Sequence, residues 1–583
     1  MLFSTRVTHF DGFRSKYVCK ISLLFSLVNY VIPVFGASTD IDRSIEIQNQ
    51  KKIQLQIENR LHNQDSNAEL EIYNVQDSKI EKKVISESFF ISKIELIKGK
   101  DSPSINSGPV FSKYEGTLMD GQKIYSLIQD LTNLVFSMGY VTSYVTVDKG
   151  NLNTGVLKLS IQWGRISGWS IDGAPPSDWH QRLRLNAALS GVPGRILNIK
   201  DIDQAIENLG GQERKATISV VAAKETGKSL LDVHLPEKVS PKLGLSIDNE
   251  GGGTASSGRD GGELNASFYD LVGVNDVLKL SVSDRKYSNP SNNALTGYGV
   301  DYHVPVGAFS FGIHYNDSSN KKLLNGIYGD YMSNGVQNIW GGRIDMIASR
   351  SAASKLVVYA NLQTKKINNY LSGQRLAASS GRYTDVGIGT EFNTSLFGGS
   401  FFSTTELDRG LRWSNSLEAS LDSNDIKKSL TRVTLNGAWS HDVTLAATAL
   451  SYQLKFGGQY SPATLIPAYK FGVGNAYTVR SYTGSPYSAD NGLYLSHTLT
   501  KANPYEVIGL ALSPLIGIDF ATLSDAEAPK LSNRLIGGVV GVTAARGKNS
   551  VLFAVGRPFY ASSTSGQNPP QTNVVHVLAN FAI

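Results

Sequence analysis

The sequence predicts an exported transmembrane β-barrel that carries an N-terminal helix and two small α/β modules. Three observations point to this fold class. The first residues have the pattern of a cleavable export signal, and no later segment approaches the ~20 apolar residues that a membrane helix needs. Segments of alternating apolar and polar residues also recur every ~20 residues from Lys238 to the end, as in barrel strands.

Composition narrows the possible functions. The chain has 583 residues, one cysteine and a net charge of +6. A single cysteine excludes a disulfide scaffold, a cysteine-rich zinc protein and an iron–sulfur protein. A net charge this small for the length gives no support to nucleic-acid binding.

Residues 1–37 are predicted to be a signal peptide. An uncharged apolar stretch, 21–34, is followed by the small residues Gly36, Ala37 and Ser38. The basic residues before the stretch are Arg14, Lys16 and Lys20. The alternative interpretation is an N-terminal membrane anchor.

A helix is predicted next, over 38–62. Residues 40–62 are rich in Gln, Glu, Lys and Ile and contain no Gly or Pro, which favours a helix. Their apolar residues scatter around the helix instead of forming one stripe. Residues 63–88 are polar and are predicted to be a linker.

Two α/β modules are predicted at 89–164 and 165–237. In the first, 89–99 alternates like one strand, and a one-sided apolar helix pattern follows from Ile124 to Met138. In the second, 178–189 and 198–210 are predicted helices and two strands follow. The order strand, helix, helix, strand, strand occurs twice, so each module buries one face of a small sheet under helices.

The barrel is predicted to span 238–583 with about 16 antiparallel strands, an even number as in bacterial barrels. The last segment shows the alternation, with His576 and Asn580 on the polar face. The residues that share the opposite, apolar face are Val575, Val577, Ala579, Phe581 and Ile583. A soluble β-sandwich or propeller is the alternative.

Motifs for catalysis are missing. Residues 222–229, AAKETGKS, fit a relaxed nucleotide-binding pattern, but a phosphate loop must open a helix and here a strand is predicted to follow. The Gly-rich stretch 250–263 is interpreted as an exposed loop or turn. The nine histidines form no metal motif, and no G-x-S-x-G occurs. We therefore predict no enzymatic activity, no cofactor, no metal and no nucleotide site.

The most informative stretch is 478–495, TVRSYTGSPYSADNGLYL, which contains Arg480. GIDFA follows at 517–521, and its alternation directs Asp519 into the lumen. The lipid-facing positions are expected to be Ile516, Ile518 and Phe520, and the lumenal ones Gly517, Asp519 and Ala521. Either Arg480 and Asp519 form a bidentate pair, or both are ordinary solvated lumen charges.

These motifs resemble those of the two-partner secretion transporters, the outer-membrane exporters of haemolysins and filamentous adhesins. The residues Val479, Arg480, Ser481 and Tyr482, with Asp490 and Gly492, resemble the V-R-G-Y…G-D-x-G loop of that family. Gly517, Asp519, Phe520 and Ala521 resemble its F/G-x-D-x-G strand. The tandem modules look like POTRA domains, through Phe136–Trp163 in the first and Gly194–Leu209 in the second. Ser481 and Ala521 stand where the family usually has Gly, so we expect a stiffer loop tip and a more crowded approach.

The resemblance implies a function. An unfolded partner exoprotein would dock on the POTRA domains, which lie in the periplasm, and would cross the outer membrane through the barrel without nucleotide. The 38–62 helix would plug the resting pore, and Arg480 and Asp519 would lock the loop in the lumen. The other expected partners are outer-membrane lipid and the barrel-insertion machinery, with no nucleic acid. A barrel-assembly factor of the same superfamily and a passive porin are the alternatives.

Overall fold

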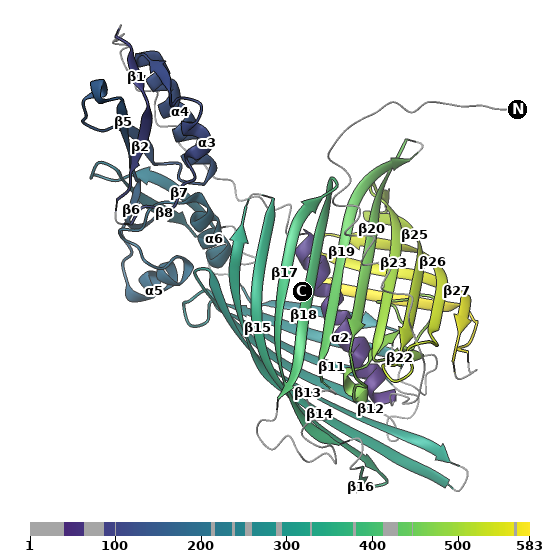
Figure 1. Cartoon of the computed structure of the whole chain (residues 1–583). Coiled ribbons are helices and arrows are strands. Elements are labelled where there is room, and N and C mark those ends of the chain that lie inside the picture. Colours follow the sequence, from purple (N-terminus) through teal and green to yellow (C-terminus); the bar gives the residue numbers. More distant parts are fainter. Residues whose placement is uncertain are drawn as a thin grey trace, which may run out of the picture.

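A computed structural model gives the fold. It describes residues 40–62, 87–99, 101–210, 216–235, 240–250, 259–286, 294–326, 329–351, 353–376, 380–411, 430–445, 447–564 and 568–582. The predicted signal peptide 1–37 and most of the predicted linker lie outside these residues. Figure 1 shows two small modules stacked beside one end of a large barrel, with a single helix inside the barrel.

The helix inside the barrel is α2, Asp40–His62. It runs along the lumen in Figure 1 and packs against the barrel wall. No residue in it is Gly or Pro, so nothing in the sequence breaks it. Among the residues that the structure describes, no helix has the length and apolar character needed to cross a membrane.

The first module combines a three-stranded sheet and a two-stranded ladder with helices. Helix α4 begins at Gly121, directly after Asp120, whose carboxylate accepts a hydrogen bond from the amide of Lys123. The helix buries Leu127, Leu131 and Val135 at four-residue spacing. The elements are β1 Phe89–Ile91, β2 Lys93–Ile97, α3 Gly108–Phe111, β3 Thr117–Met119, α4 Gly121–Ser137, β4 Tyr144–Val147, η2 Leu152–Thr154 and β5 Val156–Gln162.

The single strand predicted over 89–99 is wrong in one respect, because the chain changes partner in its middle. β1 pairs with β3, whereas β2 pairs in parallel with β5. The amides of Ser92 and Lys93 both donate to the carbonyl of Gly155, at 2.8 and 3.2 Å. This shared acceptor marks the point where the ladder breaks, and alternation alone does not reveal it.

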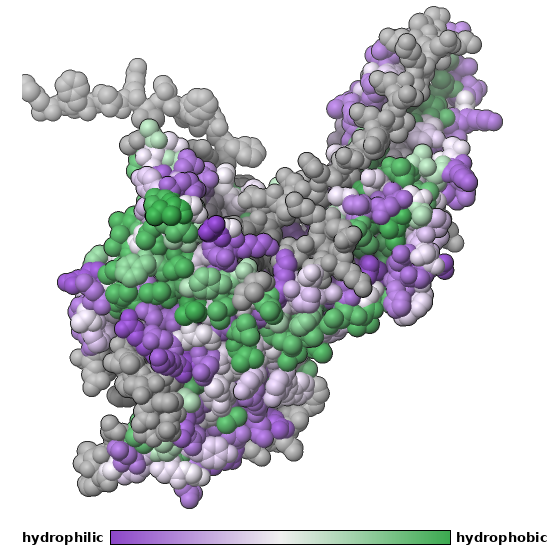
Figure 2. All heavy atoms as spheres, turned by 180° about the vertical axis from the view of Figure 1, so that it is seen from behind, coloured by the Kyte–Doolittle hydropathy of each residue, from purple (hydrophilic) through white to green (hydrophobic). Residues whose placement is uncertain are grey.

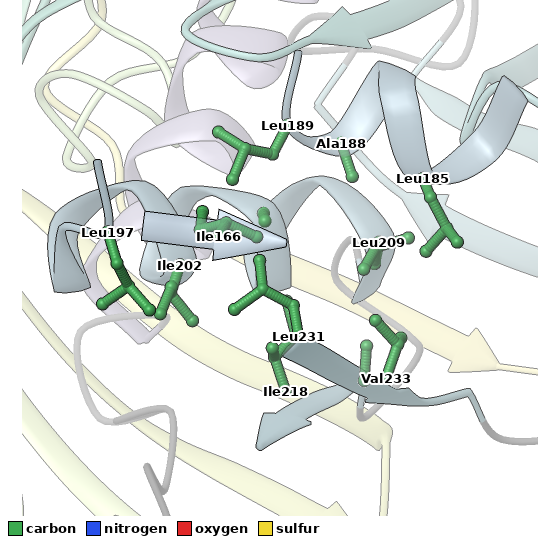
Figure 3. Close-up of a cluster of buried hydrophobic side chains, with 12 residues drawn as sticks. Ile166, Leu185, Ala188, Leu189, Leu197, Ile202, Leu209, Ile218, Leu231 and Val233 are labelled. Atoms are coloured by element: carbon green, nitrogen blue, oxygen red, sulfur yellow. The ribbon is translucent and has the colours of Figure 1, made fainter. Parts of the chain in front are cut away.

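The second module packs two helices on one sheet, in the order β6-β8-β7. Its core is drawn in Figure 3, where Leu185 of α5 and Ile202 and Leu209 of α6 point toward Ile166 and Leu231 of the sheet. The elements are β6 Arg165–Ile171, α5 Trp179–Ala188, α6 Ile199–Gly210, β7 Thr217–Ala222 and β8 Lys228–His234.

Residues 222–229 run from the end of β7 through the turn 223–227 into the start of β8. The strands pair antiparallel, and Gly227 at the turn has a φ of +75°, which favours glycine. A strand follows the turn and not a helix, so no backbone cradle for a phosphate forms. The prediction that a strand follows this motif is confirmed.

The barrel closes on itself, with β28 antiparallel to β9. Two short segments, β16 Gln374–Arg375 and β24 Tyr505–Val507, extend hairpins and are not full strands. The sixteen strands of the wall are β9 Lys242–Asp248, β10 Asp260–Tyr269, β11 Val277–Lys286, β12 Ala294–Val306, β13 Phe309–Gly326, β14 Gly329–Arg350, β15 Ser354–Leu371, β17 Gly381–Leu396, β18 Gly399–Leu411, β19 Arg432–Leu445, β20 Thr448–Tyr460, β23 Asn491–Lys501, β25 Leu510–Ser524, β26 Asn533–Arg546, β27 Asn549–Ser562 and β28 Val574–Ala582. The predicted antiparallel barrel of about sixteen strands is confirmed.

The outer face of the barrel is apolar. Figure 2 shows a band of apolar residues that crosses the wall and reaches the side on which the modules are attached. Along β25, Ile516 and Ile518 are 61% and 51% exposed, whereas Asp519 is fully buried. Side chains alternate between the two faces of a strand, so the odd positions here face inward.

The second module is fixed to the barrel through both of its helices. The Asn208 side chain on α6 donates to the carbonyl of Gly307 at 2.9 Å. Glu207, also on α6, pairs with Arg350 and Lys355 at the turn between β14 and β15. Burial raises the pKa of Glu207, but the two cations outweigh it and the net pKa falls to about 2.

Candidate functional site

The loop that joins β20 to β23, residues 461–490, folds into the lumen. It contains η5 Pro467–Tyr469 and a two-stranded hairpin, β21 Phe471–Val473 with β22 Tyr487–Ala489. Apolar burial holds it there, because Val479 is fully buried and Tyr482 nearly so. The buried cluster that includes them consists of Phe471, Val473, Val479, Tyr482, Tyr487, Ala489, Tyr494, Ala521, Leu523 and Leu535.

Arg480 at the loop tip reaches Asp519 on β25. Its Nη2 lies 2.7 Å from Asp519 Oδ1, its Nε lies 3.0 Å from Oδ2, and its own backbone amide donates to Oδ2 at 2.8 Å. The Asp519 side chain is fully buried and that of Arg480 is 16% exposed. The structure therefore brings the two residues into a forked pair, the geometry that guanidinium and carboxylate favour.

Further hydrogen bonds surround this pair. Ser496 Oγ donates to Asp519 Oδ1 at 2.7 Å. Arg480 Nη1 donates to Thr498 Oγ1 at 2.9 Å, and Nη2 donates to the carbonyl of His497 at 3.1 Å. A buried carboxylate needs such partners, because an unpaired charge in this position is costly.

A second contact holds the backbone of the loop tip. His576 on β28 lies with Nε2 against the carbonyl of Arg480 and with Nδ1 2.6 Å from Glu250 Oε1. The ring thus bridges the Glu250 carboxyl group and the backbone carbonyl of the loop tip. Glu250 follows β9, so this contact joins the loop tip to the first and last strands of the barrel.

Glu250 was expected in an exposed loop or turn over 250–263, and that prediction is wrong at both of its ends. Glu250 is 1% exposed, and Asp260 to Glu263 belong to β10. Residues 251–258 lie outside the described residues. The buried position follows from barrel closure, which places the end of β9 beside β28 and under the loop.

Glycines in the wall make room for the loop tip. A Cβ on Gly556 would lie 2.1 Å from the carbonyl oxygen of Arg480, and one on Gly537 would lie 1.8 Å from Ser481 Oγ. A Cβ on Gly517 would lie 2.4 Å from Arg480 Nη2. Ser481, which stands where the resembling family has Gly, therefore fits against a wall position that itself lacks a side chain.

Asp490 and Gly492 lie at the base of the loop. Asp490 is fully buried and accepts from the amides of Leu465 and Ala526, at 2.8 and 2.9 Å. A Cβ on Gly492 would lie 2.5 Å from the ring of Phe471. These residues shape the return of the loop into the wall and do not touch its tip.

Two of three further predicted residues, Tyr482 and Ala521, line the same region. Tyr482 Oη donates to the carbonyl of Tyr560 on β27 at 2.8 Å. Ala521 is fully buried within the apolar cluster under the loop, and Phe520 is partly exposed on the outer face. The predicted residues of the loop tip and those of β25 thus lie together in the lumen, except for Phe520, which lies on the outer face of the wall.

Helix α2 contacts both the loop and the wall. Gln50 donates to the carbonyl of Gly472 at 2.7 Å and accepts from Asn475 at 2.6 Å. Lys51 lies 3.2 Å from Asp248 and 3.3 Å from Glu263. Gln50 thus contacts the inward loop, and Lys51 contacts the first two strands of the wall, β9 and β10.

The far end of α2 has its own contacts. Lys455 pairs with Glu58 at 3.0 Å, and Gln56 donates to Glu391 at 3.2 Å. Ile57 and Leu61 pack with Phe402 and Ala438 of the wall. A helix without a single apolar stripe is thus held by polar contacts on several sides and by one apolar end.

Sequence reasoning missed Glu250, His576, Gly537 and Gly556. An inward-facing histidine in the last apolar strand was a partial signal for His576. The glycines carried no signal, because what they accommodate lies far away in the chain. Within the described ranges, no group of three or more His, Cys, Asp or Glu residues is placed to hold a metal ion.

Comparison with known families gives two matches. Residues 227–544 match the family described as haemolysin secretion/activation protein ShlB/FhaC/HecB. Residues 89–164 match the POTRA domain of ShlB type. The first match covers more than half of the chain and includes the whole inward loop.

Individual relatives match most of the chain at low sequence identity. The outer membrane transporter CdiB of Dickeya dadantii (strain 3937) is 23% identical over 547 residues, which is 92% of this chain and 94% of that protein. The hemolysin transporter protein HpmB of Proteus mirabilis is 25% identical over 445 residues, 74% of each chain.

Solved structures share the fold. CdiB from Escherichia coli superposes with a TM-score of 0.80 at 19% identity and covers 94% of this chain and all of that one. CdiB from Acinetobacter baumannii gives a TM-score of 0.75 at 20% identity, with the same coverage.

Proposed function

The chain belongs to the haemolysin secretion/activation family ShlB/FhaC/HecB, and on that premise we propose that it exports a secreted exoprotein of the haemolysin or toxin type through its barrel. It is an outer-membrane transporter of the two-partner secretion class with a POTRA domain, 89–164, in the periplasm, and we propose that 165–237 is a second POTRA domain. The curated relatives named above are transporters, and we propose that this chain has no catalytic role.

One observation carries the proposal. The lumen holds a single connected set of contacts, in which Gln50 of α2 touches the inward loop and Arg480 of that loop touches Asp519 of the wall. A passive porin needs no such arrangement and no periplasmic modules. A helix and a loop held by polar contacts can instead be displaced when a substrate chain enters, because water and substrate can replace those contacts.

We propose that α2 is the plug of the resting pore and that the Arg480–Asp519 pair is the lock of the loop. The plug contacts are mostly side-chain hydrogen bonds and ion pairs to the lumen wall. Water and the side chains of an entering substrate chain can replace polar contacts of this kind. Such a helix leaves the lumen more readily than one seated in an apolar groove.

The exoprotein is proposed to dock on a POTRA sheet edge. β4 is the last strand in the order β2-β5-β4, and its Tyr144 and Val147 are 51% and 46% exposed. An extended chain that adds to this edge bonds through its backbone, which tolerates many sequences. The other partners proposed are outer-membrane lipid around the barrel and the insertion machinery during biogenesis.

Export is proposed to need no nucleotide. The one sequence pattern that suggested a phosphate site spans the turn between β7 and β8. Folding of the exoprotein outside the cell is the proposed driving force, since a folded domain cannot return through the pore. Folding of a domain releases about 5–15 kcal/mol.

Two deletions test the function. Removing residues 40–62 is expected to raise single-channel conductance in planar bilayers, because α2 occupies the lumen. Removing residues 89–164 is expected to stop export of the partner while the barrel still inserts, as heat-modifiable gel mobility would show. Unchanged conductance in the first deletion would contradict the plug, and normal export in the second would contradict POTRA docking.

A further inference from the structure

An apolar surface is exposed where the second POTRA domain meets the barrel. Trp179 and Leu183 lie one turn apart on α5 and are 65% and 39% exposed. Leu271 and Val272, on the turn between β10 and β11, are 55% and 58% exposed. We call these four residues the junction patch.

The two halves of the junction patch are held together by fixed contacts. The side chain of Asn275 donates to the carbonyl of Arg184 at 3.1 Å, and Arg184 pairs with Asp270. The amide of Gly307 donates to the carbonyl of Ala187 at 2.8 Å. Figure 1 shows α5 at the foot of the second module, beside the module-side ends of the barrel strands. The patch is therefore one surface and not two that move separately.

The junction patch continues the lipid-facing band of the barrel. On β10 and β11, Leu264 lies opposite Val282, and both are 48% exposed on the outer face. β10 ends at Tyr269, five residues farther on, which is about 17 Å along the strand and, at a strand tilt of ~35–45°, about 12–14 Å along the membrane normal; Leu271 lies in the turn that follows. The apolar band of an outer-membrane barrel is ~25 Å tall, so the patch falls at its periplasmic edge.

The composition of the patch fits that position. Trp is enriched at the membrane–water interface, where the ring lies among headgroups and the indole N–H stays solvated. Arg182, one residue before Leu183, is exposed on α5 and is within reach of a phosphate at this level. In water, four exposed apolar side chains at one site would be unfavourable.

We propose that the junction patch rests in the phospholipid headgroup layer of the periplasmic leaflet, so that the second POTRA domain contacts the membrane as well as the barrel. The inference rests on the outer-membrane location and not on exoprotein export, so either can fail without the other. The partner is a lipid surface, recognised by apolar and aromatic insertion together with one guanidinium.

The test places a fluorescent label in the patch. The full-length protein, carrying Cys19→Ser and Leu183→Cys, is labelled with an environment-sensitive fluorophore and reconstituted into phosphatidylethanolamine–phosphatidylglycerol vesicles. The matched control carries the label at Leu118 on β3, which is 60% exposed but lies in the first module. Headgroup spin-labelled lipid is expected to quench the label at 183 and not at 118. The variant Trp179→Asp is expected to weaken the quenching at 183.

Three results would overturn the proposal. In the first, aqueous iodide quenches the label at 183 as strongly as the label at 118, and spin-labelled lipid quenches neither. In the second, protection of the label at 183 depends on protein concentration without lipid, which would indicate a second copy. In the third, this protection appears only when exoprotein is added. Heat-modifiable mobility of each variant shows that the barrel is intact, so none of these results can be ascribed to misfolding.

Discussion

The Arg480–Asp519 contact permits a quantitative test of the loop lock. The perturbations are Arg480→Ala, Asp519→Ala and the two together. Asp519 has no exposed surface and accepts four hydrogen bonds, three from Arg480 and one from Ser496. Truncating Arg480 removes two of these bonds and the compensating charge.

The magnitudes follow from burial. Removing one partner of a buried ion pair costs about 3–5 kcal/mol, and the 16% exposure of Arg480 places this pair near ~3 kcal/mol. Asp519→Ala leaves Arg480 with its bonds to Thr498 and His497, so we expect a smaller loss of about 2 kcal/mol. The double variant should lose about 3 kcal/mol and not the sum of ~5, because one interaction is removed either way. A loss of ~3 kcal/mol raises the fraction of detached loops roughly 100-fold.

The assay is export of the partner exoprotein, measured together with the temperature at which the heat-modifiable form is lost. Arg480→Lys is the conservative variant, and it is expected to restore little, because an ammonium cannot form the fork. Thr498→Ala is the matched control, since it removes one neutral hydrogen bond at the same guanidinium. Losses that add within about 0.5 kcal/mol would refute the reasoning. They would mean that the two residues act separately and that the loop is anchored elsewhere.

Three further predictions concern the wall and the junction. Gly556→Ala should impair export by pushing the loop tip away from the wall, whereas Gly342→Ala, whose added Cβ would have its nearest neighbour at 3.6 Å, should export normally; equal effects would contradict the close-approach argument. Gly537→Ala alone should impair export, and adding Ser481→Gly should restore part of it, because the two side chains compete for one space; no restoration would show that the backbone carbonyl 2.8 Å away is the obstacle. The ion pairs of Glu207 with Arg350 and Lys355 should persist unchanged at pH 5 and above. Because the pKa of Glu207 is lowered in the folded protein, its stabilising contribution is present above pH 4.5 and is lost as the pH falls toward about 2. Glu207→Gln should loosen the second module at neutral pH, as faster proteolysis between the module and the barrel would show, and the 41% exposure of Glu207 predicts a modest effect.

Local pattern was enough to predict much of the fold. Period-two alternation marks the barrel strands, because each strand has one face toward lipid and one toward water. Period 3.6 marks α4, whose buried residues are spaced by four. The division of 89–97 into two strands was not predictable in this way, because both halves alternate and only their partners differ.

The same distinction between local pattern and tertiary contacts applies to the candidate site. The sequence by itself determined that Asp519 points inward, since its neighbours Ile516 and Ile518 are apolar and alternate with it, and that Arg480 lies in a long loop between strands. Only the tertiary structure decided what meets at the loop tip. His576 and Glu250 are 326 residues apart and come together because the barrel closes its last strand on its first. Gly556 matters because the loop folds back against the wall. Alternation is a property of one strand, whereas closure and infolding depend on pairings between distant segments, and no local pattern records them.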